Sequence, residues 1–387
     1  MPSTKTRRSR WWRVGLPCFV VALAIAALVA HQLVGERDRG AEDVVQRAGK
    51  LLDEGHPEQA YQLIHRMTPD GPEAAGVLAV RGMVSASLGQ PEISRRDLER
   101  SLELRPDQPI VMKYLAAIYL SGSEMGRGLE MLKSAAKLEP KDFRPWFGMG
   151  GVYYRGGDLA AAVDAYREAL KRHPGDVEIE VRLVTALIAT GIGDDEVDSL
   201  LESLRKDRPN DPVILGLDAS LAALRGADEQ ALRLANRSLK LDPFQRDILL
   251  LRSNLASLLG QLEVALHDAE RVVKLDPTDL AGYVALTRAE SMMGLKERAA
   301  DTIELQRKAR YHRKRMSLLA LEVQSRPKDP EPRWQLGQVA AEAGSKTLAI
   351  QSYRAALALD PRCEPALRGL ANLERPAHAL TRPPAVP

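Results

Sequence analysis

Large apolar, small and turn-forming residues recur among polar ones along most of the chain, in a pattern that repeats every 34 residues. The pattern is best defined in 143–176, where the marked residues are Trp146, Gly150, Tyr153, Gly157, Ala162, Tyr166, Ala169 and Pro174. Steps of 34 residues also join Pro72, Pro106, Pro140 and Pro174, then Pro209, Pro243 and Pro277, and finally Pro327 and Pro361. A fixed period of this length predicts an array of helix pairs, each packed on its neighbours.

Each marked position has a physical role when the residues of one repeat are numbered from its start. Small residues at positions 8 and 20 let two antiparallel helices approach closely, and large residues at positions 4, 11 and 24 fill the space between them. Glycine at position 15 supplies the left-handed backbone that ends the first helix. These glycines are Gly55, Gly89, Gly157, Gly191, Gly226, Gly260, Gly294 and Gly344. Proline at position 32 ends the second helix because it lacks an amide hydrogen.

These positions resemble the signature of the tetratricopeptide repeat, in about nine copies. The resemblance implies an all-α solenoid in which every repeat has an A helix followed by a B helix. We expect repeats 1–7 in 41–279, repeat 8 in 280–329, and repeat 9 with a capping helix in 330–374. No stretch alternates apolar and polar residues, so no sheet is expected. The proline-rich tail 375–387 is expected to be disordered.

Repeat 8 departs from the pattern. Tyr311 stands where proline should close its B helix, and no glycine or proline occurs between Lys296 and Arg326, so the helix is expected to run on. The extension is basic, with no acid between Glu304 and Glu322. We consider it a candidate patch for an anion or an acidic partner; a merely solvated helix face is the alternative. The patch consists of Arg307, Lys308, Arg310, Arg313, Lys314 and Arg315.

The N-terminus predicts a membrane anchor. Residues 1–13 are basic, and residues 14–34 are almost entirely apolar, close to the roughly 20 residues that span a bilayer. The basic flank predicts a cytoplasmic N-terminus with the repeats on the other side, which is the periplasm in a bacterium. Two alternatives remain open: a cleaved signal peptide, and a receptor whose repeats face the cytosol.

Charge and residue usage exclude several classes of function. The chain of 387 residues has a net charge of +3, of which residues 1–35 supply +5, so the remainder is near neutral and unlike a general nucleic-acid binder. Two cysteines, Cys18 and Cys363, form neither a disulfide framework nor a metal cluster. Acid pairs such as Asp194-Asp195 fall at turns, where solvated charge is expected. No catalytic motif or phosphate loop occurs, so we predict no enzyme activity, no cofactor and no metal.

The family resemblance implies protein binding along the A helices, mainly through positions 2, 5, 9, 12 and 13. The predicted partner-binding residues are Lys113, Phe147, Tyr154, Ile188, Leu250, Asn254 and Trp334. Lys113 and Asn254 do not share a repeat, which argues against a chaperone-tail receptor. We expect a membrane-anchored scaffold that holds a partner protein or peptide in its groove, in envelope assembly, secretion or polysaccharide export. The alternative is a non-catalytic accessory or regulatory subunit of a membrane-associated enzyme.

Overall fold

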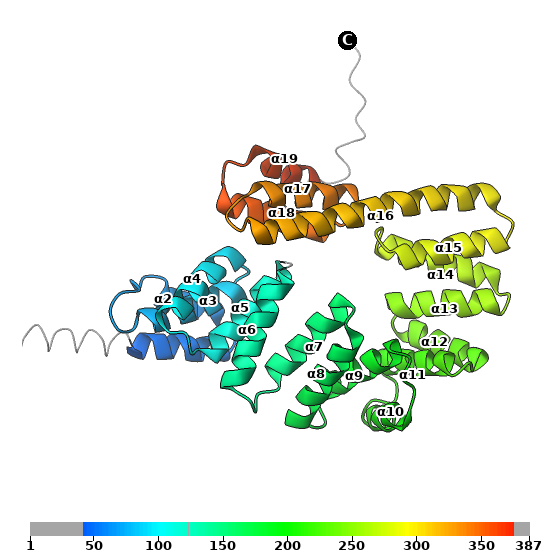
Figure 1. The fold of residues 1–387 in the computed structure, drawn as a ribbon, viewed down its shortest axis with the longest axis horizontal. Helices are drawn as coiled ribbons and strands as arrows, with labels where there is room; N and C mark the ends of the chain where they lie inside the picture. Colours follow the sequence, from blue (N-terminus) through cyan, green and yellow to red (C-terminus); the bar gives the residue numbers. More distant parts are fainter. Residues whose placement is uncertain (1–41, 123, 375–387) are drawn as a thin grey trace, which may run out of the picture. The chain divides into compact units, whose positions relative to one another are not determined.

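The computed structural model describes residues 42–122 and 124–374, which form helices and no strand (Figure 1). The A helices are 42–53, α3 (Ala74–Ser87), α5 (Pro109–Ser121), α7 (Arg144–Gly156), α9 (Val177–Ala189), α11 (Pro212–Leu224), α13 (Arg246–Leu258), α15 (Leu280–Met292) and α17 (Glu331–Glu342). The B helices are α2 (Pro57–Ile64), α4 (Pro91–Leu104), α6 (Met125–Leu138), α8 (Leu159–Arg172), α10 (Asp195–Asp207), α12 (Asp228–Leu241), α14 (Leu262–Leu275), α16 (Lys296–Ser325) and α18 (Lys346–Leu359), followed by α19 (Glu364–Glu374). The predicted all-α repeat fold is confirmed.

The described helices belong to two compact units, with the boundary between Ile118 and Tyr119 inside α5. In the first unit, α3 packs between α2 and α4 around a core that includes Ile64, Val77 and Val84. In the second unit, each helix from α6 to α19 packs on the next one along the chain. The A helices α9, α11, α13 and α15 also contact one another in that order, so equivalent positions of these repeats are neighbours.

Close helix approach follows the small–large pattern of the sequence. A Cβ atom added to Gly150 would lie 2.6 Å from the ring of Tyr166, and one added to Gly337 would lie 2.7 Å from the ring of Tyr353. Both glycines occupy position 8 and both tyrosines position 24. The predicted pairing of a small residue with a large one is therefore confirmed, and any larger side chain at position 8 would force the two helices apart.

The turns between A and B helices use the predicted glycines. All eight have a positive φ, between 69° and 82°. At Gly157 the amide hydrogens of Gly157 and Asp158 are donated to the carbonyls of Tyr154 and Tyr153, which closes α7. Asp194 and Asp195 are exposed, as expected for acids at a turn, and the Asp194 side chain also accepts hydrogen bonds from the amides of Glu196 and Val197 and caps α10.

Helix α16 is continuous over 30 residues and changes its packing partner along its length. Its buried residues are Ala299, Thr302, Ala309, Leu319 and Val323. The helix packs on α15 and on α17, and Met316 joins the cluster of buried residues around Tyr353. A single helix thus connects repeat 8 to repeat 9, as the yellow-to-orange ribbon in Figure 1 shows.

The predicted anchor at 14–34, the basic segment 1–13 and the tail 375–387 lie outside the described residues. Among the helices that the structure does describe, none combines the length and the apolar character needed to cross a membrane.

Candidate functional site

The ends of three consecutive A helices carry large apolar side chains that face solvent. Leu224, Leu258 and Met292 all occupy position 13, in α11, α13 and α15, and are 41%, 71% and 51% exposed. Because these helices pack side by side, the three side chains form a row with steps on the order of 10 Å, the usual spacing of packed helices. We call Leu224, Leu258 and Met292 the A-helix row. Exposed apolar side chains grouped in this way are typical of a binding surface.

Tyr154 lies at the neighbouring position 12 of α7 and is 36% exposed. Partial burial raises the pKa of its hydroxyl, the charge of Asp247 raises it further, and Arg182 and Arg246 oppose both effects. Charges from α9 and α13 therefore act on a side chain of α7. Tyr154 offers a partner an aromatic ring and a hydroxyl within reach of charges from two later repeats.

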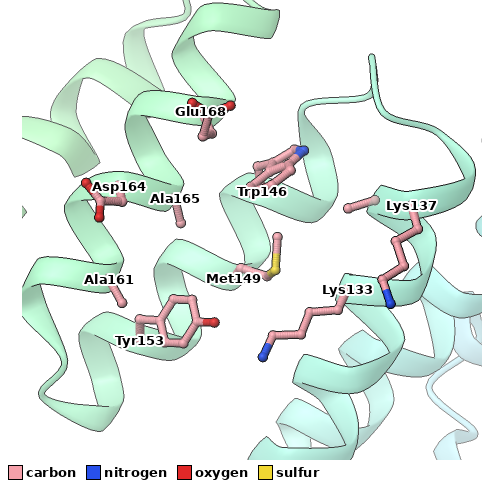
Figure 2. A pocket seen from close by; sticks show the side chains of 10 residues that line it. Lys133, Lys137, Trp146, Met149, Tyr153, Ala161, Asp164, Ala165 and Glu168 are labelled. Carbon is pink, nitrogen blue, oxygen red and sulfur yellow. The ribbon is translucent and has the colours of Figure 1, made fainter.

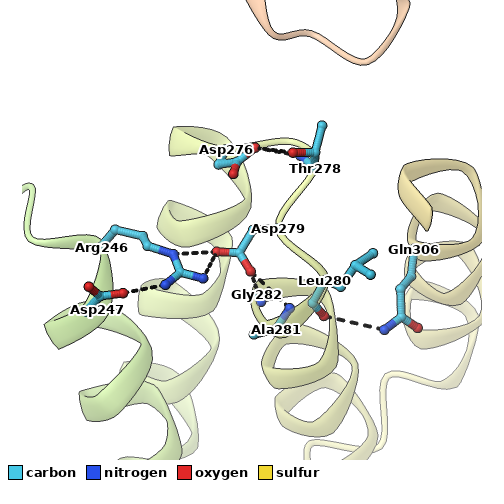
Figure 3. A network of polar contacts seen from close by, with 9 residues as sticks. All are labelled: Arg246, Asp247, Asp276, Thr278, Asp279, Leu280, Ala281, Gly282 and Gln306. Carbon is cyan, nitrogen blue, oxygen red and sulfur yellow. Dashed lines mark hydrogen bonds and ion pairs between the residues drawn. The ribbon is translucent and has the colours of Figure 1, made fainter. Parts of the chain in front are cut away.

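Arg246 is held in place by carboxylates on two helices (Figure 3). Its guanidinium donates to Asp247 on α13 and, with an Nε–Oδ2 distance of 2.6 Å, to Asp279 at the start of α15. Asp279 is buried and also accepts hydrogen bonds from the amides of Ala281 and Gly282, at 2.9 and 3.1 Å. One carboxylate thus caps α15 and ties it to α13, which fixes the spacing of two A helices.

The other predicted partner-binding residues are more enclosed than Tyr154. Phe147 and Ile188 are half-buried against the core that contains Leu183, and Phe147 lies 5.8 Å, between ring centroids, from Tyr166. Leu250 and Trp334 are likewise half-buried and pack against buried clusters that contain Leu249 and Tyr353, respectively. Each side chain therefore contributes to packing, and its role in binding stays a prediction.

The two polar residues of the predicted set lie in different units. Lys113 is half-buried in α5, within the first unit. Asn254 accepts a hydrogen bond of 3.2 Å from Arg288, which occupies the same position 9 on α15. Lys113 and Asn254 thus belong to separate units, and the role of each in binding stays a prediction.

Most of the exposed apolar residues of the A helices were not among the predicted partner-binding residues. Val213 at position 2 and Val284 at position 5 are 44% and 47% exposed, in addition to the A-helix row. All of them occupy repeat positions at which the family resemblance predicts protein binding. Their positions within the repeats therefore already indicated them as candidates. The sequence alone could not show which of those positions remain uncovered.

A pocket of about 430 Å³ lies between α6 and α8, over α7 (Figure 2). Its floor is formed by Trp146, Met149 and Tyr153. Lys133 and Lys137 line one side, and Asp164 and Glu168 line the other. Hydrogen bonds from Lys171 and then Arg172 lower the pKa of Glu168, and the Arg172 guanidinium lies 4.5 Å from the centroid of the Trp146 ring. This pocket could accept one apolar side chain of a partner.

A volume difference explains why the pocket occurs in this repeat. Position 28 of the B helix is Ala136 in α6, whereas it is Leu170 in α8 and Leu239 in α12. Leu170 packs against the core that contains Leu183, and Leu239 is buried beside Leu249. An alanine at the same place leaves the space of the missing side-chain atoms open.

The basic residues of the predicted patch all lie on α16. Arg307, Lys308, Arg310, Arg313 and Lys314 are exposed, and Arg315 is half-buried. Arg307 pairs with Glu304 one turn earlier. For the other five side chains, the described residues contain no ion pair or hydrogen bond. Anion or acidic-partner binding by this patch stays a prediction.

Metal ligation has no candidate constellation in the described part of the chain. No group of three or more histidine, cysteine, aspartate or glutamate side chains in 42–122 and 124–374 is placed to hold a metal ion. Cys363, the cysteine within these ranges, is buried and carries a free thiol. The prediction that the chain is not an enzyme rests on the sequence and on the general character of its fold.

The packing described above defines the class of protein: an all-helical solenoid built from repeated helix pairs. Residues 126–177 and 318–362 match the family model of the tetratricopeptide repeat. The chain therefore contains tetratricopeptide repeats, as its sequence pattern predicted. No curated protein matches it in sequence.

Solved structures with the same kind of fold are similar at low identity. A tetratricopeptide repeat protein from Parabacteroides merdae is 16% identical over 69% of this chain and 98% of its own, with a TM-score of 0.47. The C-terminal part of a repeat-containing protein from Cytophaga hutchinsonii is 13% identical over 62% of this chain and 99% of its own, with a TM-score of 0.46. PilF from Pseudomonas aeruginosa is 18% identical over 54% of this chain and 95% of its own, with a TM-score of 0.43.

Proposed function

We propose that the chain is a membrane-anchored, non-catalytic scaffold that binds a partner protein or peptide along its A helices. The observation that carries this proposal is the A-helix row, in which three successive repeats expose a large apolar side chain at the same position. A partner helix, or an extended peptide with apolar residues at matching intervals, fits such a row. Tyr154 would add an aromatic contact with hydrogen-bonding capacity.

The expected affinity of the row alone is modest. Full burial of a leucine or methionine side chain stabilises by about 1.5–3 kcal/mol, and these side chains are already partly covered, so each would contribute on the order of 1 kcal/mol. Micromolar binding requires about 8 kcal/mol after the costs of association. Further contacts, such as those at Tyr154, Val213 and Val284, are therefore needed for stable binding.

Photo-crosslinking in cells tests this site in the full-length protein. A crosslinkable residue is placed in turn at Leu224, Leu258 and Met292, and in matched controls at Leu138, Leu241 and Leu275. The control leucines are 42%, 54% and 45% exposed, but they lie at position 30 of the B helices. We expect one dominant adduct from the row positions and none from the controls. Adducts that form equally from both sets, or from the controls alone, would contradict the proposed site.

The identity of the adduct also separates the two functions that we considered. A structural or transport component of the envelope would support a role in assembly, secretion or polysaccharide export. An enzyme that purifies with the chain in fixed stoichiometry would instead support an accessory or regulatory subunit.

We further propose that residues 14–34 anchor the chain in a membrane, with residues 1–13 in the cytoplasm and the repeats outside it. The apolar length of 14–34 and the basic character of 1–13 support this arrangement. Membrane fractionation of the full-length chain, with a reporter of compartment fused after Pro387, tests both parts. Recovery of the intact chain in the soluble fraction would refute the anchor, and reporter activity in the cytosol would refute the orientation.

A further inference from the structure

One face of α16 carries apolar residues at both ends and cations in the middle. The residues follow one another at spacings of three or four, so they lie within about 80° of the helix circumference at 3.6 residues per turn. In order, they are Ile303, Arg307, Arg310, Lys314, Leu318 and Leu321. We call these six residues the α16 strip. At 1.5 Å per residue the strip is about 27 Å long.

The strip faces solvent along its whole length. Ile303, Leu318 and Leu321 are 46%, 45% and 60% exposed, and the adjacent Tyr311 is 66% exposed. The opposite side of the helix is anchored, because Ala309, Leu319 and Val323 are buried. The strip is therefore presented on a fixed helix, and a partner that binds it need not order the helix first.

The two central cations of the strip, Arg310 and Lys314, have no partner among the described residues. Within the described residues, the side chains of Arg310 and Lys314 form neither an ion pair nor a hydrogen bond, whereas Arg307 pairs with Glu304. Some arginines elsewhere in the repeats have carboxylate partners, for example Arg252 with Asp268 and Arg205 with Asp218. No aspartate or glutamate occurs on α16 within one turn of Arg310 or Lys314. The described residues therefore supply no complementary charge to the centre of the strip.

We propose that the α16 strip binds a helix of a partner protein whose facing stripe is apolar at both ends and acidic in the middle. Carboxylates in the centre of that stripe would pair with Arg310 and Lys314. Leucine-like residues at its ends would cover Ile303 on one side and Leu318 and Leu321 on the other. This surface is separate from the A-helix row, so the two proposals can fail independently.

The distribution of residues favours a protein partner over a membrane or a nucleic acid. In helices that lie on a bilayer, the cations flank the apolar face, whereas here cations and apolar residues share one face. Inserting Leu318 and Leu321 into lipid would draw Lys314 toward the hydrocarbon, which is costly. A phosphate backbone would pair with the cations but leave the exposed leucines in water.

The test uses the full-length protein in phosphatidylcholine nanodiscs and a fluorescent helical peptide. One face of the peptide carries leucines at both ends and a central cluster of glutamates, and a scrambled peptide of the same composition is the reference. The strip variant is Arg310→Glu/Lys314→Glu. The matched control is Lys308→Glu/Arg315→Glu, which makes the same change of charge on another side of the same helix. Circular dichroism confirms that both variants are folded.

We expect the patterned peptide to bind more tightly than the scrambled one, and the strip variant to lose about tenfold in affinity while the control stays within about twofold. A peptide with central lysines should bind the strip variant in preference to the native protein. Equal binding of patterned and scrambled peptides, or equal losses in the two variants, would overturn the proposal. So would displacement of the peptide by heparin or by phosphatidylglycerol in the disc at physiological salt, since a polyanion or a lipid would then be the preferred occupant.

Discussion

Two arginines of the repeats, Arg81 and Arg252, differ from the central cations of the α16 strip in having a buried carboxylate partner. Arg81 and Arg252 occupy position 7 of repeats 2 and 7, and each donates to an aspartate at position 23, Asp97 and Asp268, at 2.6 Å. These aspartates are almost completely buried. The cations at the centre of the α16 strip face solvent, with no carboxylate of the described chain beside them. At Arg81 and Arg252 the charge is paired inside a repeat, and at the centre of the α16 strip it faces solvent.

The largest effect should come from removing a buried carboxylate of the repeats. Asp268→Ala removes the carboxylate partner of the Arg252 guanidinium, which is only 16% exposed and keeps its hydrogen bond to Asn236. We expect the free energy of unfolding to fall by about 3 kcal/mol, because breaking one half of a buried ion pair leaves an uncompensated charge. Urea unfolding followed by circular dichroism measures this loss.

The control is Asp301→Ala, which makes the same substitution at an exposed position of α16. Its effect should lie within about 0.5 kcal/mol. Equal effects at Asp268 and Asp301 would show that the buried pair does not stabilise the repeat.

The buried carboxylate of Glu180 shows what happens without a partner, because no arginine of the described residues pairs with it as Arg252 pairs with Asp268. Glu180 is 7% exposed, and the described residues place no cation within ion-pair distance of it. Burial raises the pKa of its carboxyl, and the nearby Asp207 and Asp176 raise it further. A raised folded-state pKa means that the ionised form opposes folding at neutral pH, and that this cost disappears as the pH falls through the folded-state pKa.

Glu180→Gln should therefore stabilise the protein at pH 7, by up to about 1 kcal/mol. The gain over the native protein should shrink as the pH is lowered and the native carboxyl takes up a proton. Thermal unfolding of both proteins at a series of pH values measures the difference. A gain that is independent of pH would mean that packing, and not charge, explains it.

The sequence predicted the features that each repeat specifies locally. The glycines of eight A–B turns and the pairing of Gly150 with Tyr166 follow from backbone conformation and side-chain size, which a single repeat already fixes. The pocket beside Trp146 was not predicted, because it depends on the volume of Ala136 in the preceding repeat. The pairing of Arg252 with Asp268 was missed because it requires the register of two antiparallel helices.

The candidate site could be predicted only in part for a similar reason. Tyr154 is exposed as a groove residue should be, but Phe147 at position 5 of the same helix is half-buried against Tyr166. The two residues are both aromatic, and the sequence offered no means to separate them. Exposure at a given repeat position depends on the side chain that the next repeat places over it, which is why the A-helix row became visible only in the structure.

The smallest effect on stability should come from substitutions in the α16 strip. A small effect would show that these cations are not needed for folding. Arg310→Glu/Lys314→Glu breaks no described interaction of these side chains. We expect the free energy of unfolding to change by less than about 0.5 kcal/mol, as for other exposed substitutions. Urea unfolding of this variant and of Asp268→Ala under the same conditions compares the two losses in free energy of unfolding directly. A loss as large as that of Asp268→Ala would mean that the cations of α16 also serve folding, and the contrast between the two regions would then disappear.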